Sequence, residues 1–486
     1  MGTIQDGYMI QIEKFNETYV KVHCEDSIAQ ELSNYFTFEV PGARFIPSVR
    51  NKKWDGKIRL FNSGTHHIYA GLIEYIEDFA KQNSYPCERI SDFTDDVIDN
   101  VSDIVSGFDL TKEPRDYQLA AFAHAIRKRR SLLLSPTASG KSLIIYMLCR
   151  YFNVKTLLIV PTTSLVHQMY SDFEEYGFDS KENCHMIFSG QEKDVDKQIF
   201  ISTWQSIFKL PKKWFSQFDC VIGDEAHLFK AASLTTIMKN LSDCKYRFGF
   251  TGTLDGSQTH KLVLEGLFGT VKKVTTTSEL IEQKHLSEFK IKAIVLDYDD
   301  ETRQLIKKAT YPDEMDFLVN HAPRNKFICN LALRLTGNTL VLYQYVDKHG
   351  KAIYDEIKNK AGDRKIYFVS GTINGSDRDD IRRAVELETD SIIVASYGTF
   401  STGVNIKNLH NIIFASPSKS RVRNLQSIGR GLRLGNNKEK ACLYDIADDL
   451  QWKQKRNHTL NHFVERIKIY NEEKFDYKTY VIPFKG

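Results

Sequence analysis

The chain has 486 residues, of which 42% are hydrophobic and 26% are charged. At ~150 residues per domain this length predicts about three domains, and the composition excludes a disordered chain, a coiled-coil rod and a disulfide-stapled miniprotein. The longest apolar runs fall well short of the ~20 residues that a membrane-spanning helix needs. Eight cysteines without a C-x-x-C pair argue against a structural zinc site and fit reduced thiols in a cytosol.

The formal net charge of +4 is too small on this chain to indicate a partner. Any nucleic-acid contact must therefore come from locally clustered charge. The first eight residues lack the basic start and apolar stretch of a signal peptide. Translation could equally begin at Met9, which opens a strand-like run.

Residues 9–85 are predicted to form a small α+β module. Strand-like runs, 10–13, 19–23 and 57–61, accompany two helical stretches, 27–36 and 72–79. Residues 86–110 hold seven acids against one base, Arg89. This composition is typical of an acidic linker, although each acid could equally belong to a solvated helix face.

Two α/β units are predicted to follow, at 111–290 and 325–486. Their strands are continuous apolar runs alternating with helices, which indicates parallel sheets covered by helices on both faces. These runs are 131–134, 156–160, 198–201, 220–222 and 246–250 in the first unit, and 339–342, 365–369, 391–394 and 411–414 in the second. Residues 291–324 are largely polar, contain Pro312 and Pro323, and are interpreted as a connecting segment. A helix is expected within 453–474, and its basic residues are interpreted as part of helix packing rather than as DNA contacts.

The loop Ser135-Pro-Thr-Ala-Ser-Gly-Lys-Ser142, between the first predicted strand and an apolar helix, has the sequence and context of a P-loop. Its amides and the helix N-terminus favour phosphate, Lys141 is placed to reach the β- and γ-phosphates of ATP, and the Ser142 hydroxyl is a candidate Mg²⁺ ligand. Ser135 stands where the general pattern has glycine. The candidate phosphate-binding residues are Pro136, Thr137, Ala138, Ser139, Gly140, Lys141 and Ser142.

Two adjacent acids, Asp224 and Glu225, directly follow the predicted strand 220–222. The carboxyl ends of parallel strands are where such sheets bind ligands. Asp224 is predicted to hold Mg²⁺ and Glu225 to polarise the attacking water, since phosphoryl transfer needs little beyond a metal, positioning and charge compensation. A lone Asp-Glu pair more often caps a helix, but the upstream P-loop favours the catalytic interpretation.

Arg430 and Arg433 lie three residues apart in the second α/β unit and would share one face of a helix. Two guanidiniums on one face suit a polyphosphate, and arginine supplied by a second domain makes hydrolysis depend on domain closure. A surface salt bridge would explain two arginines alone. Together the P-loop, the acid pair and the arginines predict an ATP-driven, two-domain motor with catalytic residues Lys141, Asp224, Glu225, Arg430 and Arg433.

These motifs, in this order over residues 111–450, resemble superfamily 2 helicases and translocases, in which Ser at the first P-loop position is common. The resemblance implies two RecA-like domains. Arg115 and Gln118 are similar to the motif that reads adenine, and Gly403 and Asn405 fall in a motif V-like segment that implies nucleotide binding. The same resemblance assigns nucleic-acid contacts to Thr162, Thr163, Thr203, Gln205, Ser370, Gly371 and Thr402. Tyr397 stands where many relatives have Thr in motif V. The resemblance therefore does not decide whether this position contacts the DNA strand.

The chain resembles the UvsW-type recombination helicases of phages more specifically, because a small module with the sequence at 53–60 precedes the motor. The group of helicases to which these belong also includes repair helicases of the XPB type. The resemblance implies remodelling of stalled forks, Holliday junctions and R-loops, and so DNA, ATP and Mg²⁺ as ligands with RNA–DNA hybrids as a further substrate. It also implies a monomer in the host bacterial cytoplasm.

A basic segment lies inside the small module. Six cations flank a single acid, Asp55, with Phe45 and Trp54 interleaved; the residues proposed to bind DNA are Arg44, Arg50, Lys52, Lys53, Trp54, Lys57 and Arg59. Cations neutralise phosphates and aromatic rings stack on bases. Pro47 and Gly56 indicate a hairpin or loop. The alternative is a solvated basic face with Trp54 in the core.

An RNA helicase and the motor subunit of a restriction system are the alternatives within enzymes. An ATP-gated DNA clamp with little hydrolysis is the alternative outside them. The retention of Lys141, Glu225 and Arg430 argues against the clamp, because a protein that only binds DNA has no need of a water-activating carboxylate.

Overall fold

The computed structural model describes residues 9–485 except 41, 92, 94, 99, 189, 372–374, 403–405, 407 and 433–439, and does not describe the side chains of 230, 375–379, 401–402, 422–423 and 430. The described chain divides into two compact units. One comprises residues up to 135 and 140–274; the other comprises 275 onward together with 136–139. In the part of the chain that is described, no helix is both long and apolar enough to cross a membrane.

The N-terminal module is built on a four-stranded sheet of order β5-β2-β1-β6. β1 runs antiparallel to β2 and parallel to β6. The strands show the expected alternation, with Ile10, Ile12, Val20 and Val22 fully buried. The elements of this module are β1 (Ile10–Lys14), β2 (Tyr19–His23), α1 (Asp26–Tyr35), β3 (Thr37–Glu39), α2 (Pro47–Arg50), β4 (Lys57–Arg59), β5 (His67–Tyr69), α3 (Ile73–Gln82) and β6 (Cys87–Arg89).

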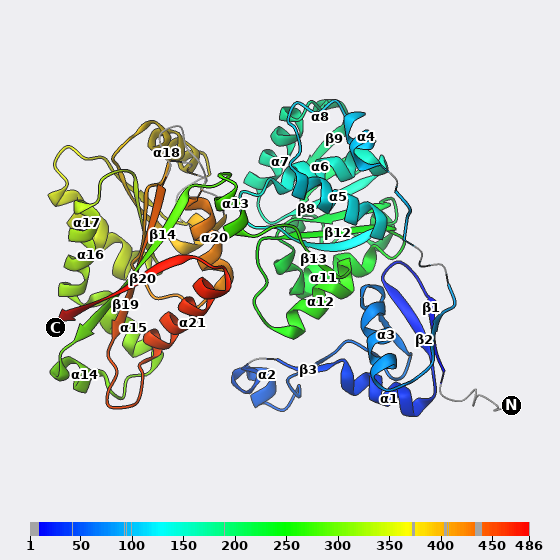
Figure 1. Ribbon diagram of the computed structural model, residues 1–486, viewed down its shortest axis with the longest axis horizontal. Helices are drawn as coiled ribbons and strands as arrows, with labels where there is room; N and C mark the ends of the chain where they lie inside the picture. The colour runs from blue at the N-terminus through cyan, green and yellow to red at the C-terminus, as the bar shows by residue number, and fades with distance from the viewer. Residues whose placement is uncertain are drawn as a thin grey trace. The chain divides into compact units, whose positions relative to one another are not determined.

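The segment 37–59, here called the arm, extends away from α1 and α3 (Figure 1). β3 and β4 form its antiparallel hairpin, and the short helix α2 lies between them. Pro47 opens α2, where its missing N–H is tolerated. The hairpin agrees with the sequence expectation, whereas the helical turn was not expected.

The first α/β domain has a seven-stranded, all-parallel sheet of order β13-β7-β12-β11-β8-β10-β9. Neighbouring strand residues point to opposite faces: Leu133 and Leu158 pack in the cluster with α5, α6 and α7, while Leu132 and Leu157 pack in the cluster with α11 and α12 (Figure 1). Its elements are α4 (Val101–Ser106), α5 (Asp116–Lys128), β7 (Arg130–Leu134), α6 (Lys141–Phe152), β8 (Thr156–Val160), α7 (Thr163–Glu175), α8 (Ser180–Asn183), β9 (Cys184–Ile187), β10 (Ile199–Thr203), α9 (Trp204–Ile207), α10 (Lys212–Phe215), β11 (Cys220–Gly223), α11 (Ala232–Asn240), β12 (Tyr246–Thr251), α12 (Gln258–Phe268) and β13 (Val271–Lys273).

The second α/β domain repeats this plan with a seven-stranded parallel sheet of order β16-β17-β15-β18-β19-β14-β20. The predicted fold class, two doubly wound parallel domains after a small mixed module, is therefore confirmed. The elements are α13 (Thr277–Glu282), β14 (Glu288–Tyr298), α14 (Asp300–Ile306), α15 (Tyr311–Asn320), α16 (Ala322–Arg334), β15 (Thr339–Tyr343), α17 (Lys351–Lys360), β16 (Ile366–Val369), α18 (Gly375–Leu387), β17 (Ile392–Ser396), α19 (Tyr397–Thr402), β18 (Asn411–Phe414), α20 (Arg421–Gly431), β19 (Lys440–Asp449), α21 (His458–Glu472) and β20 (Asp476–Phe484).

The expected connecting segment 291–324 is instead part of the second domain. β14 lies between β19 and β20 in its sheet, and its partners come more than 140 residues later in the chain, so local sequence does not reveal the pairing. Pro312 and Pro323 stand in the first turns of α15 and α16. They start helices here, where a missing N–H is harmless, rather than marking a linker.

The expected acidic linker 86–110 is also partly structured. Its first residues form β6, and Val101–Ser106 form α4. Asp95 pairs with Lys128 at 2.9 Å, and Asp96 pairs with Arg129. Two of the seven acids, Asp95 and Asp96, therefore pair with basic residues at the end of α5, a neighbourhood that the sequence alone does not reveal.

The N-terminal module and the first α/β domain share one hydrophobic cluster. Leu72 and Ile76 of the module lie in the same cluster as Leu264 and Leu267 of α12. Gly71 makes this contact possible, because a Cβ there would collide with the backbone oxygen of Glu265. The Tyr75 hydroxyl also donates to the Glu265 carboxylate at 2.7 Å. The module is therefore packed onto this domain rather than tethered to it.

Candidate functional site

The carboxyl ends of the first parallel sheet carry most of the predicted site residues. Strand order places β7, β12 and β11 side by side, followed by β8 and β10. The P-loop, the acid pair and Thr251 follow the first three strands, while the candidate DNA-contacting residues follow the last two. Sequence motifs spread over about 120 residues thus meet at one edge of the sheet. The candidate ATP-binding residues lie there beside the candidate DNA-contacting residues.

The P-loop runs from β7 into the buried helix α6. Its first residue is held by the neighbouring strand, because the Ser135 amide donates to the Thr251 carbonyl at 2.8 Å. Gly140 has a φ of +76°, and a Cβ at this position would collide with the Gln118 amide. Glycine is therefore required here both by the backbone conformation and by close packing.

Lys141, Asp224 and Glu225 are brought together as the sequence predicts. The Lys141 ammonium lies 3.6 Å from the Glu225 carboxylate and 3.9 Å from that of Asp224. Burial raises the pKa of the Asp224 carboxyl, while Lys141 acts in the opposite direction. Glu225 adopts a left-handed backbone conformation, with a φ of 51°. Strained backbone of this kind is found where side chains are held for function.

A chain of hydrogen bonds leads from the acid pair to the end of β12. His227 Nδ1 lies 3.3 Å from the Glu225 carboxylate and 3.1 Å from the Thr251 hydroxyl. That hydroxyl in turn donates to the Thr253 carbonyl at 2.8 Å. His260 Nε2 lies 2.9 Å from the His227 carbonyl oxygen. The sequence supplied these residues as separate motifs, and it contained no signal that His227 joins them.

Tyr176 is a site residue that sequence reasoning missed. Its hydroxyl lies 2.7 Å from the hydroxyl of Ser142, the candidate metal ligand. Burial raises the pKa of Tyr176 to about 12, so the phenol stays protonated and able to donate. Tyr176 caps the C-terminus of α7, whereas Thr162 caps its N-terminus. One helix therefore joins a candidate DNA-contacting residue to the P-loop serine.

Gln118, the predicted adenine reader, is almost fully buried. Its carbonyl accepts from the Arg115 amide at 2.9 Å, and its amide donates to the Gly140 carbonyl at 3.1 Å. The Arg115 side chain donates to the Tyr117 hydroxyl at 2.7 Å. Gln118 thus braces the P-loop, and the adenine contact stays a prediction.

The candidate DNA-contacting residues of the first domain differ in exposure. Thr163 and Gln205 are exposed, and Thr162 is half-buried. Thr203 is buried, and its hydroxyl lies 2.9 Å from that of Ser206. The Thr163 and Gln205 side chains are therefore accessible to a DNA strand. The Thr203 hydroxyl is already engaged by Ser206 within the protein.

Fewer of the predicted residues in the second domain can be placed. Ser370 is buried at the end of β16 and Gly371 is exposed. Thr402 ends α19, and Arg430 lies in α20, but their side chains are not among those described. Gly403, Asn405 and Arg433 lie outside the described residues. Tyr397 is buried and donates to the Ser416 carbonyl at 3.0 Å, which gives it a structural role in place of a strand contact.

The arm presents its cations to solvent. Arg44, Arg50, Lys52 and Lys53 are exposed, whereas Lys57 is half-buried. Arg59 pairs with Asp55 at 2.5 Å, so part of its charge is already compensated.

The two aromatic rings of the arm occupy different environments. Phe45 is 70% exposed, and the Arg44 guanidinium lies over its ring at 4.8 Å. Trp54 is half-buried, and its indole N–H donates to the Lys57 carbonyl at 3.0 Å. Trp54 therefore braces the arm, and Phe45 is the ring available for stacking.

A P-loop, an acid pair behind it and two parallel-sheet domains define an ATP-driven motor of helicase superfamily 2. Three family descriptions match successive parts of the chain: "DNA helicase UvsW, N-terminal" over residues 9–88, "Type III restriction enzyme, res subunit" over 111–256 and "Helicase conserved C-terminal domain" over 323–435. The chain is 36% identical to the ATP-dependent DNA helicase uvsW of Enterobacteria phage T4, with 96% of this chain and 98% of the relative covered.

Further comparisons agree. The crystal structure of T4 UvsW matches with 34% identity and a TM-score of 0.52, and the match covers 98% of this chain and 99% of that one. The XPB2 DNA 3'-5' translocase of Sulfurisphaera tokodaii is 26% identical, with 56% of each chain covered. The chain belongs to the UvsW family and is an ATP-dependent DNA helicase. This assignment sets aside the RNA helicase, the restriction subunit and the non-hydrolysing clamp.

Proposed function

We propose that this helicase remodels branched DNA by reversing forks, migrating Holliday junctions and unwinding R-loops. The observation that carries the proposal is the arm. It extends exposed cations and one exposed aromatic ring from a module that is packed onto the first motor domain. A second DNA-binding surface fixed to a motor can engage a second arm of the DNA while the motor moves along the first, and a branched substrate offers such an arm beside the motor's own strand.

The proposed ATP site uses residues at the ends of β7 and β11. In the structure Lys141 faces Asp224 and Glu225, and the phosphates of ATP would compete for its charge. Glu225 would orient and polarise the attacking water. Arg430 and Arg433 would stabilise the charge that develops on the transferred phosphoryl group. Gly403 and Asn405 would contact nucleotide, and Arg115 and Gln118 the adenine, with Gln118 also holding the P-loop.

The residues present fit Mg²⁺. This ion takes oxygen ligands and is typically held by one or two protein groups together with substrate phosphates and water. Ser142 and Asp224 supply such oxygens, and no cluster of three metal-binding side chains exists among the described residues. Ser142 and Asp224 would hold the ion against the phosphates, where its charge offsets that of the leaving group. Tyr176 would fix the direction of the Ser142 hydroxyl.

The contacts that we propose between the motor and DNA do not distinguish one base sequence from another. Hydroxyls and backbone amides, such as those of Thr163 and the Ser370–Gly371 turn, suit sugar and phosphate rather than base edges. The arm likewise acts through phosphate charge and stacking. We therefore propose that the protein selects DNA by its branching and tolerates any sequence.

A panel of substrates tests this function. The full chain with ATP and Mg²⁺ is expected to convert forks, four-way junctions and R-loops faster than it unwinds a linear duplex of equal length with a single-stranded tail. The same panel with a non-hydrolysable ATP analogue is the control. Equal rates on tailed duplex and on all three branched substrates would contradict the proposal and leave a general DNA helicase.

A further inference from the structure

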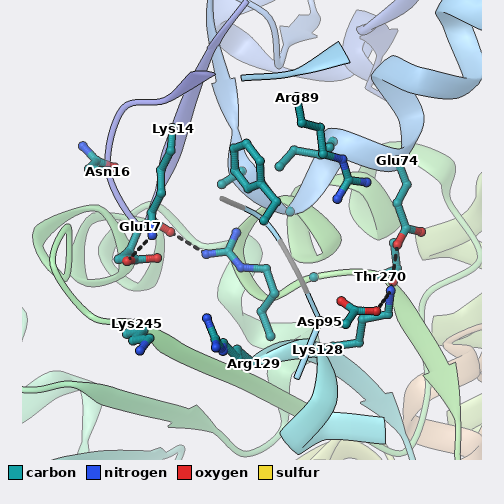
Figure 2. Close-up of a pocket in the computed structure, with 16 residues that line it drawn as sticks. Lys14, Asn16, Glu17, Glu74, Arg89, Asp95, Lys128, Arg129, Lys245 and Thr270 are labelled. Atoms are coloured by element: carbon teal, nitrogen blue, oxygen red, sulfur yellow. Dashed lines mark hydrogen bonds and ion pairs between the residues drawn. The ribbon is translucent and has the colours of Figure 1, made fainter. Parts of the chain in front are cut away.

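A cavity of about 140 Å³ lies where the N-terminal module meets the first α/β domain (Figure 2). Its walls come from the β1–β2 turn, from the start of α3, from the acidic segment and from the corner between α5 and β7. It is separate from the P-loop edge of the sheet. None of the roles proposed above uses it.

Most charged side chains around this cavity are paired. Lys14 pairs with Glu17 at 2.6 Å, Lys128 with Asp95 at 2.9 Å, and Arg129 with Asp96. Arg89, at the rim, pairs with Glu77 at 2.7 Å. The lining acids and bases therefore largely cancel one another.

Two cations remain without a carboxylate partner within 4 Å among the described residues: Arg130 and Lys245. Figure 2 shows the Lys245 side chain at the edge of the cavity, on the opposite side from Glu74. The Arg130 side chain makes a single hydrogen bond within the described chain, from its guanidinium to the Glu17 carbonyl at 2.6 Å. The carboxylate of Glu17 is meanwhile engaged by Lys14.

Arg130 is held in an environment that disfavours its charge. Burial, together with the nearby guanidinium of Arg247, lowers the pKa of Arg130 to about 10. Arg130 is half-buried and the nearby Glu17 carboxylate only partly offsets its charge; a cation withdrawn from water without an ion-pair partner is costly unless an anion compensates it. Because a guanidinium has five N–H donors in a planar fork, most of those of Arg130 remain available to a ligand.

We propose that this cavity binds a phosphate group, held by Arg130 from inside and by Lys245 at the rim. A phosphate monoester carries close to two negative charges at neutral pH, which matches the two unpaired cations. Its oxygens also suit the guanidinium fork. The group is either part of a nucleic-acid strand or a free small phosphate. Since the walls come from both the module and the domain, a bound phosphate stabilises the joint between them.

Thermal unfolding of the full chain tests the site with inorganic phosphate as the probe. In phosphate, compared with chloride at equal ionic strength, the wild-type Tm is expected to rise by about 2–4 °C. Arg130→Gln and Lys245→Gln should each lose a large part of this rise. Arg127→Gln is the matched control, because it removes the same charge from an exposed position on α5. Phosphate bound at the P-loop raises the Tm of every variant alike and cancels in the comparison.

Binding of a fluorescent single-stranded oligonucleotide then separates the two sources. If the phosphate belongs to a strand, Arg130→Gln should weaken this binding several-fold more than Arg127→Gln does. If only the thermal shift depends on Arg130, the ligand is a free small phosphate. Equal phosphate-dependent shifts in all three variants and the wild type would overturn the proposal. Lys245 is exposed, so its variant decides the matter even if Arg130→Gln fails to fold.

Discussion

Glu225 stands at the end of β11 with its carboxylate between the ammonium of Lys141 and the imidazole of His227. We expect Glu225→Gln to keep the shape of the site but lose the charge that polarises water. DNA-stimulated ATP turnover should fall by about 10²–10⁴-fold, while nucleotide binding persists. Lys141→Ala should abolish turnover as well. Both are measured by phosphate release at saturating DNA, and a Glu225→Gln protein with wild-type turnover would refute the role.

Tyr176 allows a more local prediction, because it touches the candidate metal ligand rather than the reacting phosphate. Tyr176→Phe removes only the hydroxyl that meets Ser142. The loss of one hydrogen bond, about 0.5–1.5 kcal/mol, should raise the Mg²⁺ concentration needed for half-maximal ATPase by about 2- to 10-fold. Turnover at saturating Mg²⁺ should change little.

Tyr170→Phe is the control for this experiment, since Tyr170 lies on the same helix and its hydroxyl makes no hydrogen bond to the P-loop among the described residues. An unchanged Mg²⁺ requirement in Tyr176→Phe would show that Ser142 needs no such support. A fall in thermal stability without a shift in Mg²⁺ dependence would make Tyr176 purely structural.

The arm assigns separable tasks to its two aromatic residues. Phe45→Ala should weaken junction binding by up to the value of one stacked base, about 1–3 kcal/mol, with no loss of stability, because the ring is 70% exposed. Trp54→Ala should loosen the arm, since its indole bonds the Lys57 carbonyl, and hydrogen exchange at 57–59 should become faster. Faster exchange in Phe45→Ala, or unchanged exchange in Trp54→Ala, would reverse these assignments.

Elements with a local signal could be predicted from the sequence, and those that depend on distant partners could not. β8 and β11 are continuous apolar runs, and their positions match the predicted ones within a residue. β14 and β20 are neighbours in one sheet although nearly 200 residues separate them. β20 is mostly exposed and its first five residues are polar or aromatic, so its own sequence lacks the continuous apolar run that indicates a buried parallel strand.

The same distinction applies to the site. Lys141, Asp224 and Glu225 were predicted because their motifs are contiguous and each follows a strand. Tyr176 and His227 act through partners far along the chain, Ser142 and Thr251, so their roles depend on the packing of α7 and β12. The sequence also cannot show that Arg130 lacks an ion-pair partner, because this depends on which neighbouring cations pair with the nearby carboxylates.

The shared core makes the module and the first motor domain one compact unit. Gly71 lies against the backbone of Glu265, where a side chain would collide. Gly71→Ala should therefore destabilise the protein by about 1–3 kcal/mol through overpacking, measured as a lower Tm. Gly64→Ala is the matched control, because a Cβ there would meet only the Asn62 side chain at 3.5 Å. Equal Tm values for the two variants would contradict a packed joint.

This packing changes how the module can be studied. All motor motifs follow residue 110, which suggests that a fragment from 111 would retain ATPase activity. Such a fragment would expose the face of α12 that Leu72 and Ile76 cover, and it would lack α4. If this fragment lost function, misfolding could not be distinguished from the loss of DNA contacts. Point variants on the arm avoid this difficulty because their side chains are exposed.

The central claim is that the arm gives this helicase its hold on branched DNA. The direct measurement is the salt dependence of four-way-junction binding for Arg50, Lys52 and Lys53 changed together to Gln, against a control with exposed Lys81, Lys181 and Lys358 changed to Gln. Each phosphate contact contributes ~0.9 log units of affinity per log unit of salt. We predict a slope flatter by up to about 3 in the arm variant alone, with ATPase on single-stranded DNA retained. Equal slopes and equal junction remodelling in the two variants would contradict the account.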